Sequence, residues 1–339
     1  MPMETSSILI LKASEILSLL KEQEAAIIET VKEAYLTHAA GASSLPHSSF
    51  LRFPNDEVNR IIALPAYLGG DFEISGLKWI SSFPANNNLG MERASAVIIL
   101  NSTRTGRPRA IFEGAAISAQ RTAASAALAA RYLHREDRTS TVGLIGCGPI
   151  NFEIVKFLRA VFPGIRNLII FDTQPDRCRS FGERCRNSFA EMQVRIAGDA
   201  QEVLRSSPLI SVATTAVKPH ISQVPGSLPG TTILHISLRD LSAEVILAGD
   251  NVVDDIDHVC RANTSVHLAE QVVSNRNFIR CTLADVINGQ APARGSDLGP
   301  SIFSPFGLGI LDLAVSKWVY DEATRQGIGT MIDSFSAPE

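Results

Sequence analysis

Two glycines, Gly146 and Gly148, carry the clearest chemical signal in this sequence. They form a Gly-x-Gly turn that follows an apolar run and precedes a helical pattern. Such a turn lets the backbone approach a pyrophosphate, and the N-terminus of the next helix supplies N–H donors and a positive dipole end. Asn151 stands where the usual motif has a third small residue. Because ordinary strand-to-helix turns also carry glycines, the motif alone leaves a nucleotide site and a structural turn open.

An acidic residue follows at the spacing that a dinucleotide site requires. Asp172 ends the next apolar run, 24 residues after Gly148, close to the position of the acid that binds a ribose diol. An acid there repels a 2′-phosphate, so it favours NAD over NADP. Arg177 represents the alternative, because a guanidinium near this position can bind that phosphate.

Three cations lie among apolar or small residues. Arg52 and Lys78 each interrupt a strand-like apolar run, and Arg121 lies within an Ala-rich helical stretch. A buried unpaired cation is costly, so each needs an anion or a route to solvent. For Arg52 and Lys78 the alternative is that strand alternation points both side chains to water.

The composition is that of an ordinary globular protein. The chain has 339 residues, 45% of them hydrophobic and 19% charged, with a net charge of −4. This length predicts one large domain or two of ordinary size. Without a basic block, neither nucleic acid nor an anionic membrane is an expected partner. The five cysteines lack a CxxC pattern, which favours a reducing compartment over a structural metal. No signal-peptide pattern or membrane-spanning run is visible, so a cytoplasmic protein is expected.

Strands and helices alternate from about residue 139. This pattern predicts a doubly wound parallel sheet, with its ligand beyond the carboxyl ends of the strands. The expected strands are residues 142–145, 167–171, 193–197, 209–214, 232–236 and 251–253, and the stretch 263–303 reads as irregular. Polar groups at two strand ends, Thr214-Thr215 and Ser237 to Asp240, are therefore candidates for the site.

The first part of the chain has a different pattern. A helix over residues 23–40 precedes strands over 49–53, 60–68, 74–83 and 94–101, and an Ala-rich helix over 115–133. A last helix over 310–326 returns to this part. We expect an α/β protein with a Rossmann-type doubly wound parallel sheet (residues 119–303) and an α+β substrate-binding and dimerisation domain (1–118 with 304–339).

Five motifs, in this order, resemble the ornithine cyclodeaminase/mu-crystallin family. They are Lys78, Pro84-Ala85-Asn86 with Gly90, Thr105-Gly106-Arg107-Pro108, Arg121-Thr122-Ala123-Ala124 and Gly146-Cys147-Gly148. The chain departs from ordinary cyclodeaminases at residues 90–95 and 113–115. Four other stretches look like the branch that makes L-2,3-diaminopropionate for siderophores and peptide antibiotics: Ser81-Ser82-Phe83-Pro84, Glu92-Arg93-Ala94-Ser95, residues 121–127 and Ser237-Leu238-Arg239-Asp240.

The resemblance implies a reaction. NAD⁺ takes a hydride from the glutamate Cα of N-(2-amino-2-carboxyethyl)-L-glutamate, and hydrolysis of the imine gives L-2,3-diaminopropionate and 2-oxoglutarate. By this resemblance Arg52, Lys78 and Arg121 bind the α-carboxylate, and Asp240 contacts the reacting amine and water. Lys78 and Asp240 are thus the expected catalytic residues, although a loop acid such as Asp240 can also simply cap a turn.

The remaining expected site residues fall into two sets. A substrate with three carboxylates needs several cations, and Arg93 and Arg239 are extra to the simple cyclodeaminase pattern. The expected substrate-binding residues are Arg52, Lys78, Met91, Arg93, Arg121 and Arg239. The expected cofactor-binding residues are Arg121, Thr122, Gly146, Gly148, Pro149, Ile150, Asp172, Arg177, Thr214, Thr215, Ser237 and Gly307. No metal is expected.

Several alternatives stay open at this point. Within the family they are an ornithine or lysine cyclodeaminase, a ketimine reductase and an alanine dehydrogenase. A non-catalytic ligand-binding protein is an alternative of another class, which the combination of Lys78, Arg121 and Asp240 disfavours. Because first domains in this family pair across a sheet, the resemblance also implies a homodimer.

Overall fold

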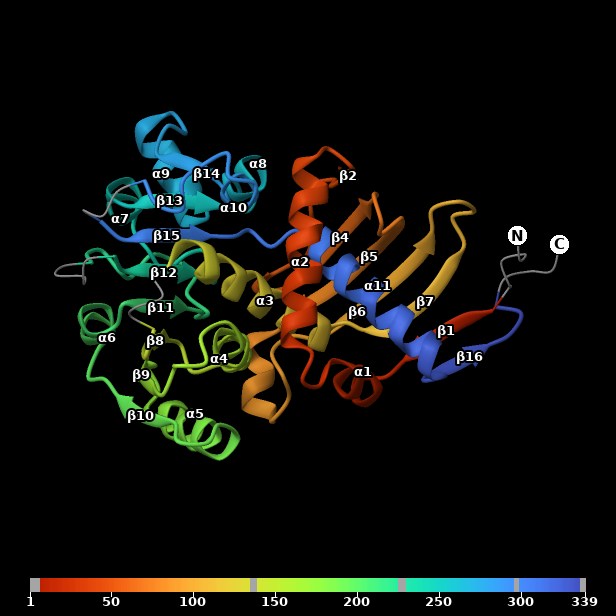
Figure 1. The fold of residues 1–339 in the computed structure, drawn as a ribbon, viewed down its shortest axis with the longest axis horizontal. Coiled ribbons are helices and arrows are strands. Elements are labelled where there is room, and N and C mark those ends of the chain that lie inside the picture. Colours follow the sequence, from red (N-terminus) through yellow and green to blue (C-terminus); the bar gives the residue numbers. More distant parts are fainter. Residues whose placement is uncertain (1–6, 135–138, 225–229, 296–298, 336–339) are drawn as a thin grey trace. The chain divides into compact units, whose positions relative to one another are not determined.

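The structure is a computed structural model that describes residues 7–134, 139–224, 230–295 and 299–335. The chain divides into two compact units, each with its own sheet (Figure 1). Unit 1 comprises Met1–Arg121 and Leu308–Glu339, and unit 2 comprises Thr122–Gly307. The sequence placed these boundaries after residues 118 and 303.

Unit 2 contains a sheet of eight parallel strands. In spatial order they are β10 (Gln193–Ile196), β9 (Asn167–Phe171), β8 (Thr141–Ile145), β11 (Leu209–Val212), β12 (Thr232–His235), β15 (Ser301–Ser304), β13 (Asp250–Val253) and β14 (Ile279–Thr282). The chain runs from β8 outward through β9 and β10, then returns to β11 on the other side of β8. The predicted doubly wound sheet is confirmed, and β8 and β11 flank the point where the strand order reverses.

Helices connect these strands. They are α4 (Pro149–Val161), α5 (Pro175–Ser188), α6 (Ala200–Ser206), α7 (Ala243–Ala248), α8 (Ile256–Val259), α9 (Ser265–Val273) and α10 (Leu283–Ile287), and α3 (Ala115–Leu133) leads into the unit. Strands β11 and β12 are buried at every position, as expected for a parallel sheet covered on both faces.

The prediction of irregular structure over residues 263–303 was wrong. This stretch contains α9, β14, α10 and β15. The two strands have four residues each, too few for a period to show, and β15 begins and ends in serine. Tertiary burial, not local pattern, makes β15 an inner strand of the sheet.

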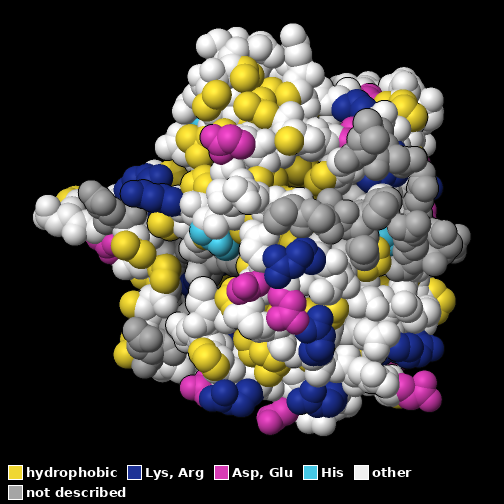
Figure 2. All heavy atoms as spheres, turned by 90° about the vertical axis from the view of Figure 1, so that its left-hand side faces the viewer, with side chains coloured by type: hydrophobic (Ala, Val, Ile, Leu, Met, Phe, Trp, Pro, Cys, Tyr) yellow, Lys and Arg dark blue, Asp and Glu magenta, His cyan; other side chains and the backbone are white. Residues whose placement is uncertain are grey.

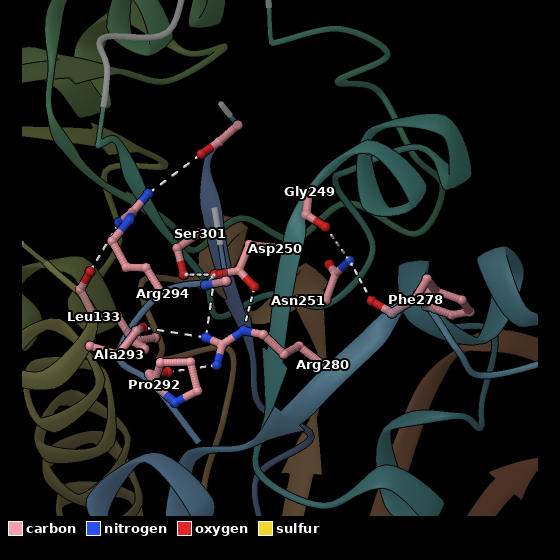
Figure 3. A network of polar contacts seen from close by, with 12 residues as sticks. Leu133, Gly249, Asp250, Asn251, Phe278, Arg280, Pro292, Ala293, Arg294 and Ser301 are labelled. Atoms are coloured by element: carbon pink, nitrogen blue, oxygen red, sulfur yellow. Dashed lines mark hydrogen bonds and ion pairs between the residues drawn. The ribbon is translucent and has the colours of Figure 1, made fainter. Parts of the chain in front are cut away.

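A polar network ties the starts of three strands together (Figure 3). Asp250, at the start of β13, accepts from Arg280 of β14 (2.5 Å to Nε) and from the hydroxyl of Ser301 (3.2 Å), which begins β15. Arg294 donates to the carbonyls of Leu133 and Thr231. This network lies at the amino ends of the strands, so it leaves the carboxyl ends to the ligand.

Unit 1 contains a mixed sheet. Its strand order is β16 (Thr330–Ile332), β1 (Ile8–Leu11), β7 (Pro108–Glu113), β6 (Ala96–Ser102), β5 (Ile74–Ser82), β4 (Asp56–Leu68) and β2 (Ser43–Ser44), and β3 (Ser49–Phe53) also pairs with β4. Only β1 and β7 are parallel among these pairs in the described chain. A short 3₁₀ helix (Pro84–Leu89) follows β5, and the α-helices are α1 (Ala13–Leu20), α2 (Glu24–Ala39) and α11 (Gly309–Gln326).

Helix α11 lies against one face of this sheet, over β4, β5 and β6, and packs against α2 (Figure 1). A glycine permits the close approach. A Cβ at Gly76 of β5 would lie 2.2 Å from the carbonyl oxygen of Ile99 and 3.0 Å from the side chain of Leu313. At this contact the first turns of α11 pack on β5, the strand that carries Lys78.

Candidate functional site

Two buried cations of unit 1 share one buried carboxylate. Lys78 Nζ lies 2.7 Å from Asp312 Oδ2, and Arg121 Nε lies 3.1 Å from Asp312 Oδ1. Lys78 also donates to the hydroxyl of Ser118 at 3.2 Å. Lys78 and Arg121 are 2% and 9% exposed, and Asp312 is fully buried. We call Lys78, Arg121 and Asp312 the buried triad; its side chains carry two positive charges and one negative.

Three separate elements position the buried triad. Lys78 lies on β5 two residues after Gly76, on the same face of the strand, where α11 approaches most closely. Asp312 lies in the first turn of α11, and Arg121 comes from α3. The sequence analysis placed Lys78 and Arg121 in the site but missed Asp312. The sequence feature that could have indicated Asp312 is an acidic residue among the apolar residues at the start of α11, which are buried in the structure.

The environment changes the proton affinity of Lys78. The pKa of the Lys78 ammonium is lowered to about 8: burial is the main cause, the charge of Arg121 acts in the same direction, and Asp312 opposes both. A lysine with this pKa is mostly charged at neutral pH and loses its proton at mildly alkaline pH. The triad therefore offers a positive charge for a carboxylate under ordinary conditions.

Three arginines lie on the same face of the unit 1 sheet, beyond the buried triad. Arg52 of β3 is directly opposite Arg60 of β4, and Arg60 is directly opposite Ser82 of β5. Arg93 donates from Nη1 to the hydroxyl of Ser82 at 3.0 Å. Ser82 is four residues from Lys78 on β5, so both point to one face. We call Arg52, Arg60 and Arg93 the arginine row.

The expected grouping of Arg52 with Lys78 and Arg121 differs from this arrangement. The structure brings Lys78 and Arg121 together on Asp312 and places the exposed Arg52 beside Arg60 instead. Sequence reasoning missed Arg60, because only the strand register reveals its position opposite Arg52.

The glycine turn of unit 2 has the geometry that its motif requires. Gly146 has φ +95°, and a Cβ there would lie 2.3 Å from the carbonyl oxygen of Ala213 at the end of β11. Gly148 directly precedes α4 as its N-cap residue and has open space around its Cα, because a Cβ would meet nothing within 4 Å. Asn151 is buried and bridges the turn, donating to the carbonyls of Ile145 and Gly146 and accepting from Ser211.

Asp172 is held directly beside this turn. It follows β9, and its Oδ2 accepts from the backbone N–H of Cys147 at 2.9 Å while Oδ1 accepts from that of Gln174 at 3.0 Å. The carboxylate is partly exposed and thus has remaining acceptor capacity for a diol. Arg177 is partly exposed on the first turn of α5.

Asp240, a buried carboxylate of unit 2, is almost saturated with hydrogen bonds. Thr214 Oγ1 donates to its Oδ1 and Ser237 Oγ to its Oδ2, and His220 Nε2 lies 3.1 Å from Oδ1. Burial alone would raise the pKa of Asp240, but the hydrogen bond from His220, the neighbouring His235 and the hydroxyl of Ser237 together hold that pKa well below its usual range. Asp240 is therefore an anion at every physiological pH.

His220 was missed by sequence reasoning, and no local motif marks it. Its side chain is 43% exposed, whereas Asp240 is fully buried. Because an ionised carboxylate only accepts, His220 must donate its Nε2–H to Asp240, which leaves Nδ1 as the proton-accepting atom. Leu238, two residues before Asp240, has φ +73°, a strained conformation for a bulky residue.

The other predicted site residues lie in less distinctive surroundings. Met91 is 52% exposed, and Arg239 donates to the backbone carbonyl of Ala262 at 2.7 Å. Gly307 has φ +92° and donates its N–H to the buried Asp254 at 2.8 Å. Burial raises the pKa of Asp254 to about 6, although three backbone N–H groups act against that rise. Pro149, Ile150, Thr122 and Thr215 are exposed or partly exposed.

These features fit a dinucleotide. The N-terminus of α4 has open space at Gly148, no side chain of the described residues caps it, and Asp172 lies at the neighbouring strand end. Among the described residues no group of His, Cys, Asp or Glu could hold a metal ion. In the same part of the chain, no helix has the length and apolar character needed to cross a bilayer. Basic and acidic side chains lie close together on the face drawn in Figure 2.

Known proteins share this architecture. The model of the ornithine cyclodeaminase/mu-crystallin family matches residues 8–327. N-((2S)-2-amino-2-carboxyethyl)-L-glutamate dehydrogenase of Staphylococcus aureus is 29% identical over 316 residues, which cover 91% of this chain and 93% of the relative.

Two solved structures resemble the whole chain. One is Δ1-pyrroline-2-carboxylate reductase of Thermococcus litoralis in complex with NADH and L-proline (27% identity, TM-score 0.86, 95% of this chain and 99% of that one). The other is an archaeal alanine dehydrogenase dimer with bound NAD (29% identity, TM-score 0.85, 96% and 99%). The expectations of an oxidoreductase and of NAD as its cofactor are thus confirmed at the level of the family. The chain belongs to the ornithine cyclodeaminase/mu-crystallin family.

Proposed function

We propose that this chain is an NAD-dependent oxidoreductase that converts N-(2-amino-2-carboxyethyl)-L-glutamate, NAD⁺ and water into L-2,3-diaminopropionate, 2-oxoglutarate, NADH and a proton. The product is a precursor of siderophores or peptide antibiotics, and the reaction takes place in the cytoplasm. The observation that carries the proposal is the number of cations on one sheet face of unit 1: Lys78, Arg121 and the arginine row. A monocarboxylate amino acid does not require so many, whereas this substrate has three carboxylates.

The residues of unit 1 bind and orient the substrate in this proposal. Lys78 and Arg121 bind the α-carboxylate of the glutamate moiety, and Asp312 holds both cations in place. Arg52 and Arg93 bind further negative charge, and Met91 contacts the substrate. Because Asp312 fixes Lys78 and Arg121 before the substrate arrives, these two side chains lose little conformational freedom on binding.

The residues of unit 2 bind the cofactor and move protons. Gly146 and Gly148 with the N-terminus of α4 accommodate the pyrophosphate, and Asp172 accepts from the ribose diol. When bound, NAD⁺ supplies the acceptor for a hydride. Asp240 acts as the fixed anion that favours the positive charge on the amine and imine. His220 Nδ1 then receives the proton, because Asp240 holds the opposite ring nitrogen. Arg239 adds positive charge for the substrate.

We also propose a homodimer. The sheet face of unit 1 opposite α11 carries a set of partly exposed apolar residues on neighbouring strands, which includes Leu51, Ile61, Trp79, Val97 and Ile99. Leu51 and Trp79 are 45% and 37% exposed. An apolar sheet face of this kind is typical of a surface that a partner covers. A Trp79→Glu variant should therefore sediment as a monomer if this face forms the dimer; an unchanged dimer would refute this interface.

An absorbance assay at the NADH band tests the proposed reaction. The enzyme is incubated with NAD⁺ and, separately, with N-(2-amino-2-carboxyethyl)-L-glutamate, L-ornithine, L-lysine or L-alanine. We expect stoichiometric NADH from the first substrate and at least about a hundredfold lower kcat/KM for the others, because a site built for polar groups rejects analogues that lack them.

The alternatives give different results in the same assay. A cyclodeaminase would consume ornithine or lysine without net NADH, and an alanine dehydrogenase would form NADH from alanine. Saturable NAD binding without turnover of any of these compounds would indicate a ligand-binding protein. Any of these three outcomes, with no NADH from the tricarboxylate amine, would refute the proposal.

A further inference from the structure

Arg60 is a cation in a position that no simple structural role explains. It lies on β4, directly opposite Arg52 on β3. Its polar contact within the described chain is a long one, 3.5 Å from Nη1 to the carbonyl oxygen of Val58. Burial lowers the pKa of the Arg60 guanidinium, and the charge of Arg52 lowers it further. Two like charges directly opposite in a sheet are destabilising, so the pair costs stability while no anion lies between them.

Neither arginine has an acidic partner in the part of the chain whose side chains the structure describes. No Asp or Glu oxygen there lies within 4.0 Å of a side-chain nitrogen of Arg52 or Arg60. The Arg52 guanidinium lies over the ring of Phe50 on its own strand, 5.8 Å from the centroid. This contrasts with Lys78 and Arg121, which share Asp312.

A hydrogen bond to Ser82 places a third guanidinium, that of Arg93, beside these two. Arg52, Arg60 and Ser82 are directly opposite one another across β3, β4 and β5, and Arg93 binds the Ser82 hydroxyl. Neighbouring strands are about 4.8 Å apart, so Arg52 and Arg60 start from adjacent positions on one face, and the Arg93 guanidinium lies at the next position, on Ser82. Arginines so arranged bind carboxylates with forked hydrogen bonds.

The distance from the buried triad can be bridged only by long side chains together with a substrate whose carboxylates are separated. Ser82 is four residues from Lys78 along β5, about 14 Å at about 3.4 Å per residue, and the long lysine and arginine side chains can span part of this distance. In a glutamate skeleton, four C–C bonds of about 1.5 Å separate the two carboxylate carbons by about 5 Å.

We propose that Arg60, with Arg52 and Arg93, binds the substrate carboxylates remote from the reacting carbon, and that Arg60 makes the site prefer a polycarboxylate. This inference rests on the proposed function for the identity of the substrate. The buried triad fixes the α-carboxylate, and the arginine row selects for additional carboxylates at the other end. Arg60 is thus a specificity-determining residue, which neither the motifs nor the family resemblance indicated.

A binding experiment without turnover tests this assignment. Calorimetry on the NADH-bound enzyme, with no amine present, compares 2-oxoglutarate with 2-oxopentanoate, which has a methyl group in place of the remote carboxylate. For Arg60→Gln we expect the Kd for 2-oxoglutarate to rise about ten- to hundredfold, because a charged hydrogen-bonding partner is lost. The Kd for 2-oxopentanoate should change less than about threefold.

Two further variants serve as controls. Arg60→Lys retains the charge without the fork, so it should recover part of the preference for 2-oxoglutarate. Arg104→Gln removes an exposed arginine from the turn between β6 and β7 of the same sheet and should leave both Kd values unchanged. Thermal unfolding of each variant establishes that the enzyme is folded.

The outcomes separate this inference from the proposed function. If Arg60→Gln changes both Kd values equally, or neither, the inference is wrong, whatever the wild-type enzyme turns over. If Arg60→Gln selectively weakens 2-oxoglutarate but the wild type forms no NADH from the tricarboxylate amine, the carboxylate subsite stands and the proposed reaction fails.

Discussion

The buried triad and the arginine row lie on one sheet face of unit 1, and they differ in whether an acidic residue balances their positive charges. In the buried triad, Lys78 and Arg121 are desolvated and share the carboxylate of Asp312. In the arginine row, Arg52 is exposed, Arg60 lies opposite it, and neither has an acidic partner in the described chain. Buried cations need an internal acid because an unpaired buried charge is very costly. Cations near water can do without one and thus remain available to a ligand.

This difference predicts different roles for the buried triad and the arginine row. The buried triad is a rigid element, and it offers the excess positive charge of two cations over one acid. In the proposed function, the arginine row serves binding and not folding. Mutations that remove charge should therefore affect stability at one end and substrate selection at the other.

Removal of the shared acid should have the largest effect. Asp312→Asn leaves two buried cations without their carboxylate, so we expect the free energy of unfolding to fall by about 3–5 kcal/mol. Urea denaturation measures the change. Asp321→Asn on the exposed side of α11, where Asp321 pairs with Lys317 at 2.6 Å, is the matched control and should cost less than about 1 kcal/mol. Equal losses for the two variants would contradict the distinct role of the triad.

The pH dependence of activity should reveal Lys78. Its pKa is lowered to about 8, so the ammonium is lost as pH rises through that value. If the charged form binds the α-carboxylate, kcat/KM should fall about tenfold per pH unit above pH 8. An arginine stays protonated over this range, so Lys78→Arg should abolish the alkaline fall, at reduced activity. Measurement of kcat/KM from pH 6 to 10 for the wild type and for Lys78→Arg tests this prediction. The same alkaline fall in both enzymes would exclude Lys78 as the origin of the fall.

Loss of charge from the arginine row should have the smallest effect on stability. For Arg60→Gln we expect the free energy of unfolding to change by less than about 0.5 kcal/mol, with stabilisation favoured because a like-charge contact with Arg52 disappears. The change should shrink at high salt. Urea titrations at low and high ionic strength measure it. A loss of several kcal/mol would mean that Arg60 has a structural role instead.

Local signals in the sequence sufficed for the first strands and helices of unit 2. The glycine turn and the alternation of strands and helices predicted the parallel sheet, because each signal lies within a few residues of the feature that it reports. The same signals placed Asp172 beside the turn, where it now accepts from the backbone of Cys147. They failed over residues 263–303, where four-residue strands owe their place to tertiary packing.

The site in unit 1 depended on contacts that no local pattern contains. Asp312 is 234 residues away from Lys78 along the chain, and no spacing rule connects them. Arg60 was overlooked for another reason: the strand was predicted to begin at residue 60, whereas β4 begins at Asp56. Only the observed register between β3 and β4 places Arg60 opposite Arg52. The chemistry of single residues could be predicted from the sequence, but the residues that they contact in the fold could not.

The central claim is that a hydride leaves the glutamate Cα of a tricarboxylate amine and does not return. The most direct test uses N-(2-amino-2-carboxyethyl)-L-glutamate with deuterium at that carbon, incubated with the enzyme and NAD⁺ and analysed by mass spectrometry. We predict deuterium in the reduced cofactor, with one equivalent each of 2-oxoglutarate and L-2,3-diaminopropionate. Deuterium returned to an amino-acid product, or a substrate left unchanged, would contradict the claim.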